Sequence, residues 1–374
     1  MTERFFQDLV GRLDSATPED IGSTIVELFT EAFGTSSAEA WVIDIGATDL
    51  TSVMRPEEHV PVAGSRLGAV YEDARVAVED ATVMVPLSVR GLPFGVLTVT
   101  GGAVPDDVIA VAGTVIGNAL RATERHSDFI DVLRGGEDLG LSATIQRSVL
   151  PDRALSHELV ELTARIEPAY EAAGDAFDYA ALAQRLDLAL FDAVGHGTRA
   201  ALLSSAAVGS YRYARRRLDR LSDMHGLIDG VIADQGRPAD FVTGIVSRLE
   251  LETGTLEGFN AGHLPPIIVE LDGGVREIAV ERPGLPLGLR GAAARFSTRL
   301  VPGELLVMYS DGVSEAGTDV VTPWGRERLY EYVAQAVRAH SSLRDICNGL
   351  LHEVLGYAGP RLRDDATVVM ARLR

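Results

Sequence analysis

The stretch LALFDAVGHGTRAALL, from Leu188 to Leu203, changes character twice within a few residues. An apolar run ends at Asp192, a Gly-His-Gly turn follows, and an alanine- and leucine-rich segment begins after the turn. This order predicts a strand, a tight turn and a helix. Two side chains are candidates for chemistry: Asp192 at the end of the strand and His196 in the turn.

Composition limits what the chain can be. Its 374 residues, 46% of them hydrophobic, are enough for two or three domains with sizeable cores. The net charge of -20 argues against general nucleic-acid binding, which needs a basic surface, and against adsorption to anionic membranes. Excess carboxylates are compatible with cation sites without proving them.

Cysteine usage and the amino terminus bear on the compartment. Cys347 is the one cysteine, so an intrachain disulfide and a thiolate zinc site are excluded. MTERFFQDLVGRLDS lacks the basic region and apolar core of a signal peptide, and no apolar stretch approaches the roughly 20 residues that span a bilayer. We expect a cytoplasmic protein, with Cys347 as a small buried residue.

The first 125 residues mix helix and strand. Residues 17–33 have helical spacing, with Thr17 placed as a cap and Pro18 in the first turn. Strands are predicted at 38–45, 81–89 and 90–101. The pattern is α+β and contains no catalytic cluster.

A helical segment follows. Residues 106–134 carry apolar side chains at helical spacing, interrupted by Gly135 and Gly136, and a short helix at 139–151 ends at Pro151. The apolar positions of the longer helix are Val108, Val111, Val115 and Leu120. Two interpretations stay open: a linker packed on one domain, or a connector that pairs two protomers and carries a signal.

From about residue 158 short strands dominate, interrupted by helical stretches at 198–219 and 325–356. The pattern predicts a sandwich covered by helices. Three of its apolar strands adjoin aspartates: Asp192, Asp311, and the pair Asp364 and Asp365. A further pair, Asp175 and Asp178, lies just upstream. Each alone suits a turn, but together, without Cys or His clusters, they indicate a site for Mg²⁺ or Mn²⁺.

Six segments occur in one order: EAAGDAFDYA, LFDAVGHGTRAALL, FVTGIVSRLELETGTLEGFNAGHLPPIIV, GLPLGL, LLVMYSDGVSEA and RDDATVVM. Together they resemble the bacterial metal-dependent serine/threonine phosphatases of the PP2C (PPM) superfamily, in the sporulation and stress-response (SpoIIE/RsbU-like) branch. The resemblance covers roughly residues 140–374 and implies a β-sandwich flanked by helices with a two-metal site at one end. IQRSVLP also looks like the helix that precedes the domain in that branch.

The resemblance implies roles for particular residues. Asp192 would bridge two Mn²⁺ or Mg²⁺ ions, with the Ala193 carbonyl as a further ligand. Asp175, Asp311 and Asp364 would be the other metal ligands. Asp365 would act behind them, and Asp178 would be structural or water-mediated. Ala173 replaces the first glycine of the family's Gly-Gly-Asp segment, and Ala176-Phe177 stands where a Trp-Tyr pair is common.

The two histidines have two interpretations each. His196 could protonate a serine leaving group, because histidine titrates near neutrality. A turn histidine that holds the loop is the favoured alternative. His263, in the NAGH turn, is similarly interpreted as scaffold.

The amino-terminal region resembles a GAF domain, a small-ligand and signal-sensing module; a PAS-like sensor is the competitor. AWVIDI and the Pro86–Leu97 hairpin carry the match. The predicted organisation is therefore a GAF-like α/β sensor domain (1–125), a helical linker or switch (126–155) and a PP2C-type phosphatase domain (156–374).

The implied function is a protein serine/threonine phosphatase, a phosphoric monoester hydrolase, in which metal-activated water attacks a phosphoserine or phosphothreonine. The implied substrate is an anti-sigma-factor antagonist. The implied regulation runs through the sensor, which could bind a small ligand or protein, and through a homodimer formed by sensor and linker helices. Alternatives are a non-catalytic partner-switching adaptor and a small-phosphometabolite hydrolase. The basic run 211–220 could bind an acidic partner, although a solvated helix face is favoured.

Overall fold

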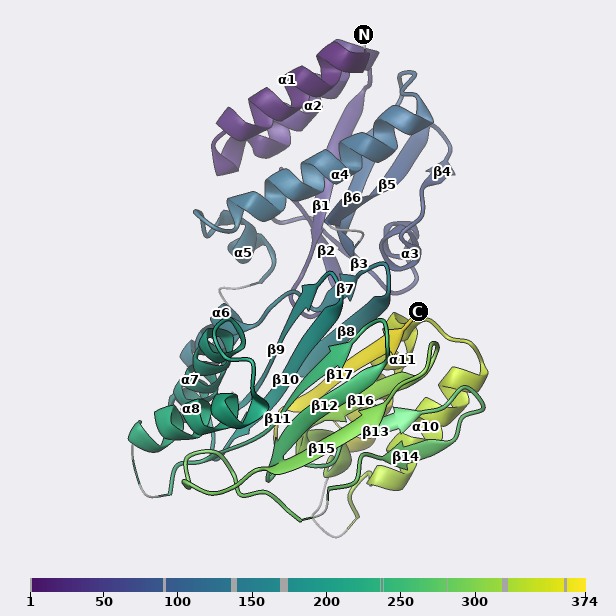
Figure 1. Cartoon of the computed structure of the whole chain (residues 1–374). Coiled ribbons are helices and arrows are strands. Elements are labelled where there is room, and N and C mark those ends of the chain that lie inside the picture. Colours follow the sequence, from purple (N-terminus) through teal and green to yellow (C-terminus); the bar gives the residue numbers. More distant parts are fainter. Residues whose placement is uncertain are drawn as a thin grey trace. The chain divides into compact units, whose positions relative to one another are not determined.

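A computed structural model describes residues 2–89, 92–135, 140–168, 174–235, 237, 239–280, 282–317, 322–359 and 362–374, with only the backbone of Leu92. Ala173 and Gly136, noted in the sequence, lie outside these ranges. The chain divides into two compact units, Met1–Leu139 and Gly140–Arg374 (Figure 1). No described helix is both long and apolar enough to cross a membrane.

The first unit is built on one antiparallel six-stranded sheet with the order β3-β2-β1-β6-β5-β4. The strands are β1 (Ser37–Ile43), β2 (Asp49–Ser52), β3 (His59–Pro61), β4 (Ala77–Glu79), β5 (Thr82–Val89) and β6 (Leu92–Thr100). The helices are α1 (Thr2–Ser15), η1 (Pro18–Asp20), α2 (Ile21–Phe33), α3 (Arg66–Asp73), α4 (Asp106–Thr123) and α5 (Phe129–Leu133).

Strand alternation divides the core of this unit between the two faces of its sheet. Residues such as Val42 and Leu97 pack with α1, α2, α4 and α5 on one face. Their strand neighbours Trp41 and Val96 face the other side, where Val70 of α3 packs. The strands predicted at 38–45, 81–89 and 90–101 are confirmed as β1, β5 and β6.

Two helix predictions in this unit need correction. Thr17 does not cap through its side chain; its hydroxyl donates to Asp20 at 2.6 Å, and the α-helix begins only at Ile21. The helix predicted over 106–134 ends at Thr123, after which Ser127 accepts the Phe129 amide at 3.1 Å and the short α5 follows.

The face of α4 is also corrected. Val111 is half exposed, whereas Ile116 is fully buried. The core-facing row contains alanine and glycine, which let the helix lie close to the sheet: a Cβ at Gly113 would lie 2.9 Å from Val85. Val108 and Leu120 are buried, as the spacing predicted, and Val115 packs partly against the same core, so only Val111 lies off the buried stripe.

The second unit contains two antiparallel sheets, β15-β12-β11-β10-β9 and β14-β13-β16-β17-β8-β7. The first comprises β9 (Asp175–Leu182), β10 (Arg185–Ala193), β11 (Val242–Glu250), β12 (Thr255–Ala261) and β15 (Ala294–Arg299). The second comprises β7 (Ala154–Ser156), β8 (Val160–Glu167), β13 (Ile267–Val269), β14 (Val275–Glu277), β16 (Leu305–Tyr309) and β17 (Ala366–Leu373).

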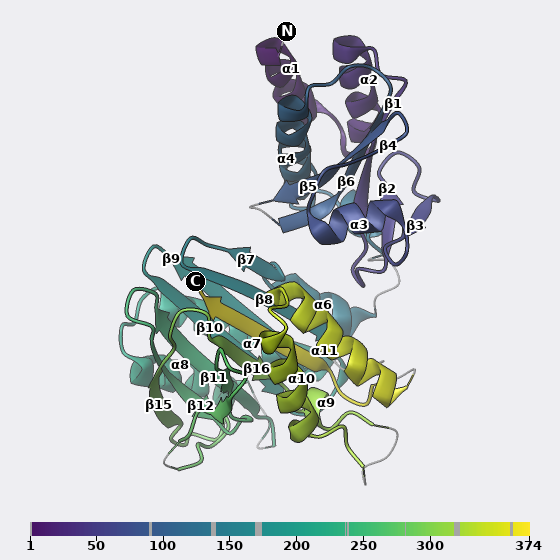
Figure 2. The same ribbon diagram turned by 90° about the vertical axis from the view of Figure 1, so that its right-hand side faces the viewer.

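Helices cover both outer faces of the sandwich (Figures 1 and 2). They are α6 (Leu141–Val149), α7 (Gly197–Arg215) and α8 (Leu221–Asp234) on the β9–β11 side, and α9 (Asp311–Ser314), α10 (Arg326–Arg338) and α11 (Leu343–Ala358) on the other. The predicted helix-covered sandwich is confirmed. Cys347 of α11 is fully buried in the core on this side of the sandwich, as expected.

Some elements of this unit differ from the sequence prediction. The stretch 325–356 forms two helices because His340 adopts a positive φ of 56° and Ser342 starts the second by accepting the Asp345 amide at 3.1 Å. The sequence analysis did not predict α8, β9 or β15. The predicted linker 126–155 is divided, with α5 in the first unit and α6 in the second.

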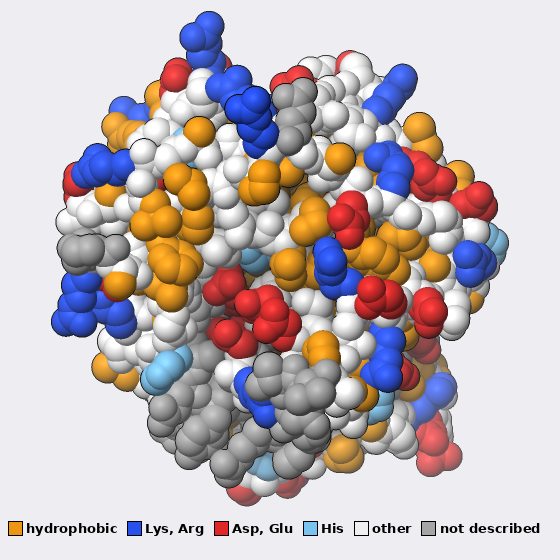
Figure 3. All heavy atoms as spheres, turned by 90° about the horizontal axis from the view of Figure 1, so that it is seen from below, with side chains coloured by type: hydrophobic (Ala, Val, Ile, Leu, Met, Phe, Trp, Pro, Cys, Tyr) orange, Lys and Arg blue, Asp and Glu red, His pale blue; other side chains and the backbone are white. Residues whose placement is uncertain are grey.

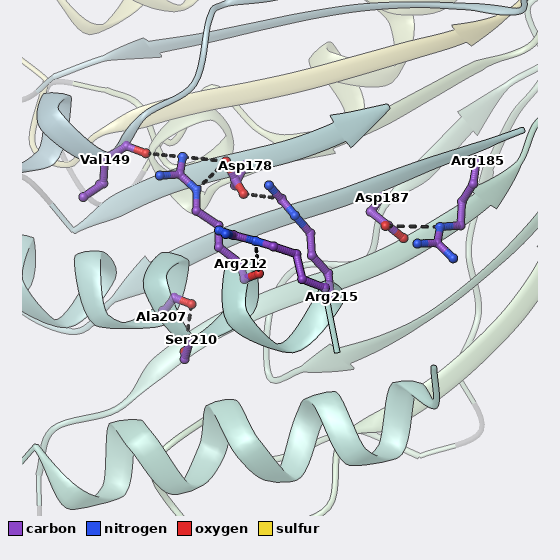
Figure 4. Close-up of polar contacts among 9 residues, drawn as sticks. Val149, Asp178, Arg185, Asp187, Ala207, Ser210, Arg212 and Arg215 are labelled. Atoms are coloured by element: carbon purple, nitrogen blue, oxygen red, sulfur yellow. Dashed lines mark hydrogen bonds and ion pairs between the residues drawn. The ribbon is translucent and has the colours of Figure 1, made fainter. Parts of the chain in front are cut away.

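The basic run on α7 is split between interior and surface (Figure 4). Arg212 and Arg215 turn inward to the carboxylate of Asp178, which is 1% exposed. Arg212 also donates to the Val149 carbonyl at 2.6 Å, at the end of α6. Asp178 is therefore structural, as one interpretation of the sequence held. The later arginines of the run, Arg216, Arg217 and Arg220, are exposed.

Replacing Asp178 should strongly destabilise the second unit. Asp178→Ala leaves two guanidinium groups without their buried partner, and we expect a loss of roughly 3–5 kcal/mol in the free energy of unfolding. Urea denaturation measures it. The matched control is Asp234→Ala, which removes an exposed pair with Arg290 and should cost less than about 1 kcal/mol. Equal losses would refute the structural role of Asp178.

Candidate metal centre

Strand alternation brings the predicted carboxylates to one end of the sandwich interior. Along β10, Leu186, Leu188 and Leu190 face the space between the sheets. The next inward position is Asp192, and its partner in the β9 register is Asp175. Both carboxylates therefore continue rows of buried apolar side chains.

The second sheet presents its acidic residues at the same end. Ser310 and Asp311 follow β16, and Asp364 and Asp365 precede β17. The Ser310 amide donates to the Thr367 carbonyl at 3.0 Å, which ties the two segments together. All five aspartates that the sequence analysis associated with the site thus lie at neighbouring strand ends.

Asp175 is the most enclosed of the predicted ligands, at 2% exposure. Thr367 donates its hydroxyl to the Asp175 carboxylate, and the Asp175 amide lies 3.4 Å from the carboxylate of Asp365. Burial, together with the charges of Asp192 and Asp365, holds its pKa well above the usual range. This carboxylate is costly to ionise unless a cation approaches.

Asp192 has the second strongly perturbed carboxylate. Burial, followed by the charges of Asp311, Asp364 and Asp365, raises its pKa to about 7. The pKa of Asp311 is raised by burial and by Asp364. Burial also raises that of Asp364, while His196 opposes the shift. The carboxylates therefore form one electrostatically coupled group.

The Gly-His-Gly turn leaves His196 exposed beside this group. Gly195 and Gly197 have φ values of 90° and 73°, a region that favours glycine. His196 precedes the first turn of α7 without a side-chain capping bond. The histidine expected to hold the loop by bonding backbone therefore has no such bond to a described residue. Its ring lies near enough to Asp364 to affect that carboxyl group.

Gly174 leaves room at the backbone carbonyl of Ala193. The Ala193 amide donates to the Gly174 carbonyl at 3.0 Å. A Cβ at position 174 would lie 2.7 Å from the Ala193 oxygen, closer than such contacts allow. The absence of a side chain here keeps the predicted carbonyl ligand unobstructed from this direction.

Gln146 is a site residue that the sequence analysis did not single out. It is 4% exposed and projects from α6. Its side-chain amide donates to the Asp175 carbonyl at 2.8 Å and to the Asp365 carboxylate at 2.9 Å. The sequence signal was faint: one glutamine in the short helix that precedes the phosphatase-like region. Through it, α6 contacts strand ends from both sheets.

The donor set fits a hard divalent cation. It consists of carboxylate and carbonyl oxygens, the ligands that Mg²⁺ and Mn²⁺ prefer, and acidic side chains gather on one face of the molecule (Figure 3). Among the described residues, no three Asp, Glu, His or Cys side chains form a group that could hold a metal ion. The fit therefore lies in the type of donor: an ion here would bind through one or two carboxylates and keep several waters, as Mg²⁺ usually does.

The second unit has the fold of a PP2C-type sandwich domain, with the acidic residues at one end. The SiaA-PP2C domain of Pseudomonas aeruginosa shares the fold with a TM-score of 0.54 at 21% identity, over 64% of this chain and 97% of that one. The profile of the family described as Stage II sporulation protein E (SpoIIE) matches residues 183–374, just over half of the chain. The chain belongs to the SpoIIE family, as the ordered motifs predicted.

Other similar proteins share only part of their length with this chain. Phosphoserine phosphatase RsbU of Bacillus subtilis is 22% identical over 245 residues, which are 63% of this chain and 70% of RsbU. Protein IcfG of Synechocystis is 27% identical over 142 residues, 38% of this chain and 22% of IcfG. The RsbU and RsbW domains of Rv1364c from Mycobacterium tuberculosis align at 25% identity, TM-score 0.51, over 58% of this chain and 60% of that one.

Removing the charge of Asp192 should stabilise the metal-free protein at alkaline pH. Its folded-state pKa of about 7 lies above the usual value of 3.8, because the folded protein favours the protonated carboxyl. The contribution of this group to the free energy of unfolding is therefore lost as pH rises from the usual value through about 7. We expect Asp192→Asn to raise the melting temperature of EDTA-treated protein by a few degrees at about pH 8 and by less at about pH 5.5. Asp234→Asn serves as the exposed control. A gain that is the same at both pH values would contradict the shifted pKa.

Proposed function

We propose that the chain is a metal-dependent protein serine/threonine phosphatase that removes phosphate from a phosphoserine or phosphothreonine. The observation that carries the proposal is the coupled carboxylate group at one end of a PP2C-type sandwich, in which the pKa of Asp192 is raised to about 7. Similarity to a phosphoserine phosphatase, RsbU, supports the reaction type.

In this proposal two Mn²⁺ or Mg²⁺ ions would be held by Asp175, Asp192, Asp311 and Asp364, with the Ala193 carbonyl as a further ligand. Such ions supply a Lewis acid that activates water and neutralises phosphate charge.

The protein's own residues would position the reacting groups. Asp192 stands at the centre, because it lies opposite Asp175 of the neighbouring strand β9 and couples to the carboxylates of the second sheet. His196, exposed in the turn beside Asp364, has the access needed to give a proton to a leaving alkoxide.

The proposed substrate is a phosphorylated anti-sigma-factor antagonist. The support is similarity to RsbU and to an RsbU domain found in one chain with an RsbW domain. We place the reaction in the cytoplasm, in keeping with a chain whose single cysteine is a buried thiol.

We further propose that residues 1–125 are a GAF-like sensor, open to a small ligand or protein, and that sensor and linker helices form a homodimer. The sensor proposal is supported by a separate antiparallel sheet with its own core.

Ile130 and Leu133, in the proposed linker, are buried in that core, so these two side chains are not available to a dimer contact. Sedimentation of the full chain measures the dimer, and a monomer at micromolar concentration would rule it out.

Substitutions at the turn should separate the two candidate residues. We expect Asp192→Ala to lower Mn²⁺-dependent hydrolysis of p-nitrophenyl phosphate and of a phosphoserine protein by at least about 100-fold, because it removes the central carboxylate. His196→Ala should cost less than about 10-fold, below the range typical of an essential general acid. Both variants are assayed with and without Mn²⁺.

The outcomes distinguish the alternatives. Retained partner binding without any metal-dependent turnover would favour the adaptor. Turnover of small phosphometabolites but not of phosphoprotein would favour the metabolite hydrolase. A loss of about 100-fold or more in His196→Ala would make that residue the proton donor.

Gln146 offers a test of whether α6 controls the site. Gln146→Ala removes the donor shared by the Asp175 carbonyl and the Asp365 carboxylate. We expect the Mn²⁺ concentration for half-maximal activity to rise about 10-fold, as for other groups that orient metal ligands. Ser148→Ala, exposed on the same helix, is the control. An unchanged Mn²⁺ requirement in Gln146→Ala would show that α6 does not control the site through this side chain.

A further inference from the structure

His263 connects the two sheets at the acidic end of the sandwich. Its Nδ1 lies 2.7 Å from the Thr243 hydroxyl on β11, and its Nε2 lies 3.1 Å from the Tyr309 carbonyl on β16. Asn260 fixes the backbone of the turn, accepting the His263 amide at 2.8 Å and donating to the His263 carbonyl at 2.9 Å. The ring is thus held by contacts on both of its nitrogens.

These contacts determine which nitrogen carries the proton. A backbone carbonyl can only accept, so Nε2 must be the N–H that donates to Tyr309. Burial lowers the pKa of His263 to about 4, which leaves the ring neutral near pH 7. Nδ1 then has a free lone pair, and the Thr243 hydroxyl must donate to it.

The direction of that hydroxyl matters for Asp192. Thr243 is the partner of Asp192 in the β10–β11 register, so the two side chains are neighbours on the same face of the sheet. A bond donated by the Thr243 hydroxyl lowers the pKa of the Asp192 carboxyl. A hydroxyl has one hydrogen. If it is donated to His263, Thr243 turns only lone pairs toward Asp192.

We propose that His263 is a positioning residue for the divalent-cation site. By accepting the Thr243 proton, it prevents Thr243 from donating to Asp192 and keeps the carboxylate's lone pairs available to the cation. The inference rests on the proposed function, since it assumes that Asp192 binds the cation. The proposed role differs from that of a scaffold residue, because His263 would affect cation binding by fixing the orientation of the Thr243 hydroxyl and not by holding the turn in place.

A double-mutant cycle on the full chain, with Mn²⁺ binding measured by calorimetry, tests the proposal. His263→Phe frees the Thr243 hydroxyl to turn to Asp192, and we expect about 10-fold weaker Mn²⁺ binding. Thr243→Val removes the hydroxyl while keeping its shape and should bind Mn²⁺ as the wild type does. The double variant should recover wild-type affinity, because no hydroxyl remains to be oriented.

A purely structural histidine would give a different pattern, with the double variant binding as weakly as His263→Phe. That result would overturn the proposal. His59→Phe is the matched control, because His59 makes the same Nδ1 contact with a threonine, Thr51, at 3.0 Å in the first unit. It should leave Mn²⁺ affinity unchanged.

Nitrogen NMR of ¹⁵N-histidine-labelled, metal-free protein provides a measurement that does not depend on activity or on the stability of a variant. We expect His263 to show the neutral Nε2–H tautomer near pH 7, with Nδ1 shifted when Thr243→Val removes its donor. A protonated Nδ1 would overturn the proposal. Wild-type protein that binds no Mn²⁺ would refute the proposed function and this inference together, whereas Mn²⁺ binding without recovery in the double variant would refute this inference alone.

Discussion

Repulsion among crowded carboxylates, of which Asp175 and Asp365 are buried, is the constraint on which the acidic end of the sandwich depends. The register places Asp175 opposite Asp192, and the second sheet adds Asp311, Asp364 and Asp365. Moving such charges out of water is costly unless they are protonated, hydrogen-bonded or paired with a cation. The raised pKa values at Asp175 and Asp192 express this cost in the metal-free protein. In the proposed function, the same repulsion would favour binding of a divalent ion.

Packing and ion pairs elsewhere in the second unit hold these carboxylates close together despite their mutual repulsion. The inward-facing leucines of β10 are buried in the core between the two sheets, and Asp192 is the next inward position on that strand. A shift of this strand end would therefore disturb the core. On the outer face, Asp178 pairs with Arg212 and Arg215 and so fastens β9 to α7. Asp175 and Asp178, three positions apart on β9, therefore lie in opposite electrostatic environments. Asp178 is paired with arginines, whereas Asp175 faces other carboxylates.

The sequence was sufficient to predict features that depend on strand alternation or on the order of motifs. Alternation with a terminal aspartate predicted the sandwich and its acidic end, and the ordered motifs predicted the family. The sequence was insufficient where a single side chain contacts residues that are distant in the chain. Gln146 contacts residues distant in the chain, and nothing local distinguishes it from a surface glutamine. The core-facing row of α4 includes Gly113, which hydrophobic spacing does not indicate, and Val111 of the predicted row is exposed.

Hydroxyl orientation gives the two facing aspartates different chemistry. Thr367 donates to a carboxylate oxygen of Asp175, which lowers the electron density available there. Thr243, next to Asp192, lies between that carboxylate and the Nδ1 of His263, and the ring's bond to Tyr309 requires its proton on the histidine side. In the arrangement we propose, one aspartate therefore receives a proton donor and the other does not. In a group where every carboxylate is crowded by like charge, this proposed difference would make Asp192 the stronger ligand for a cation that both could reach.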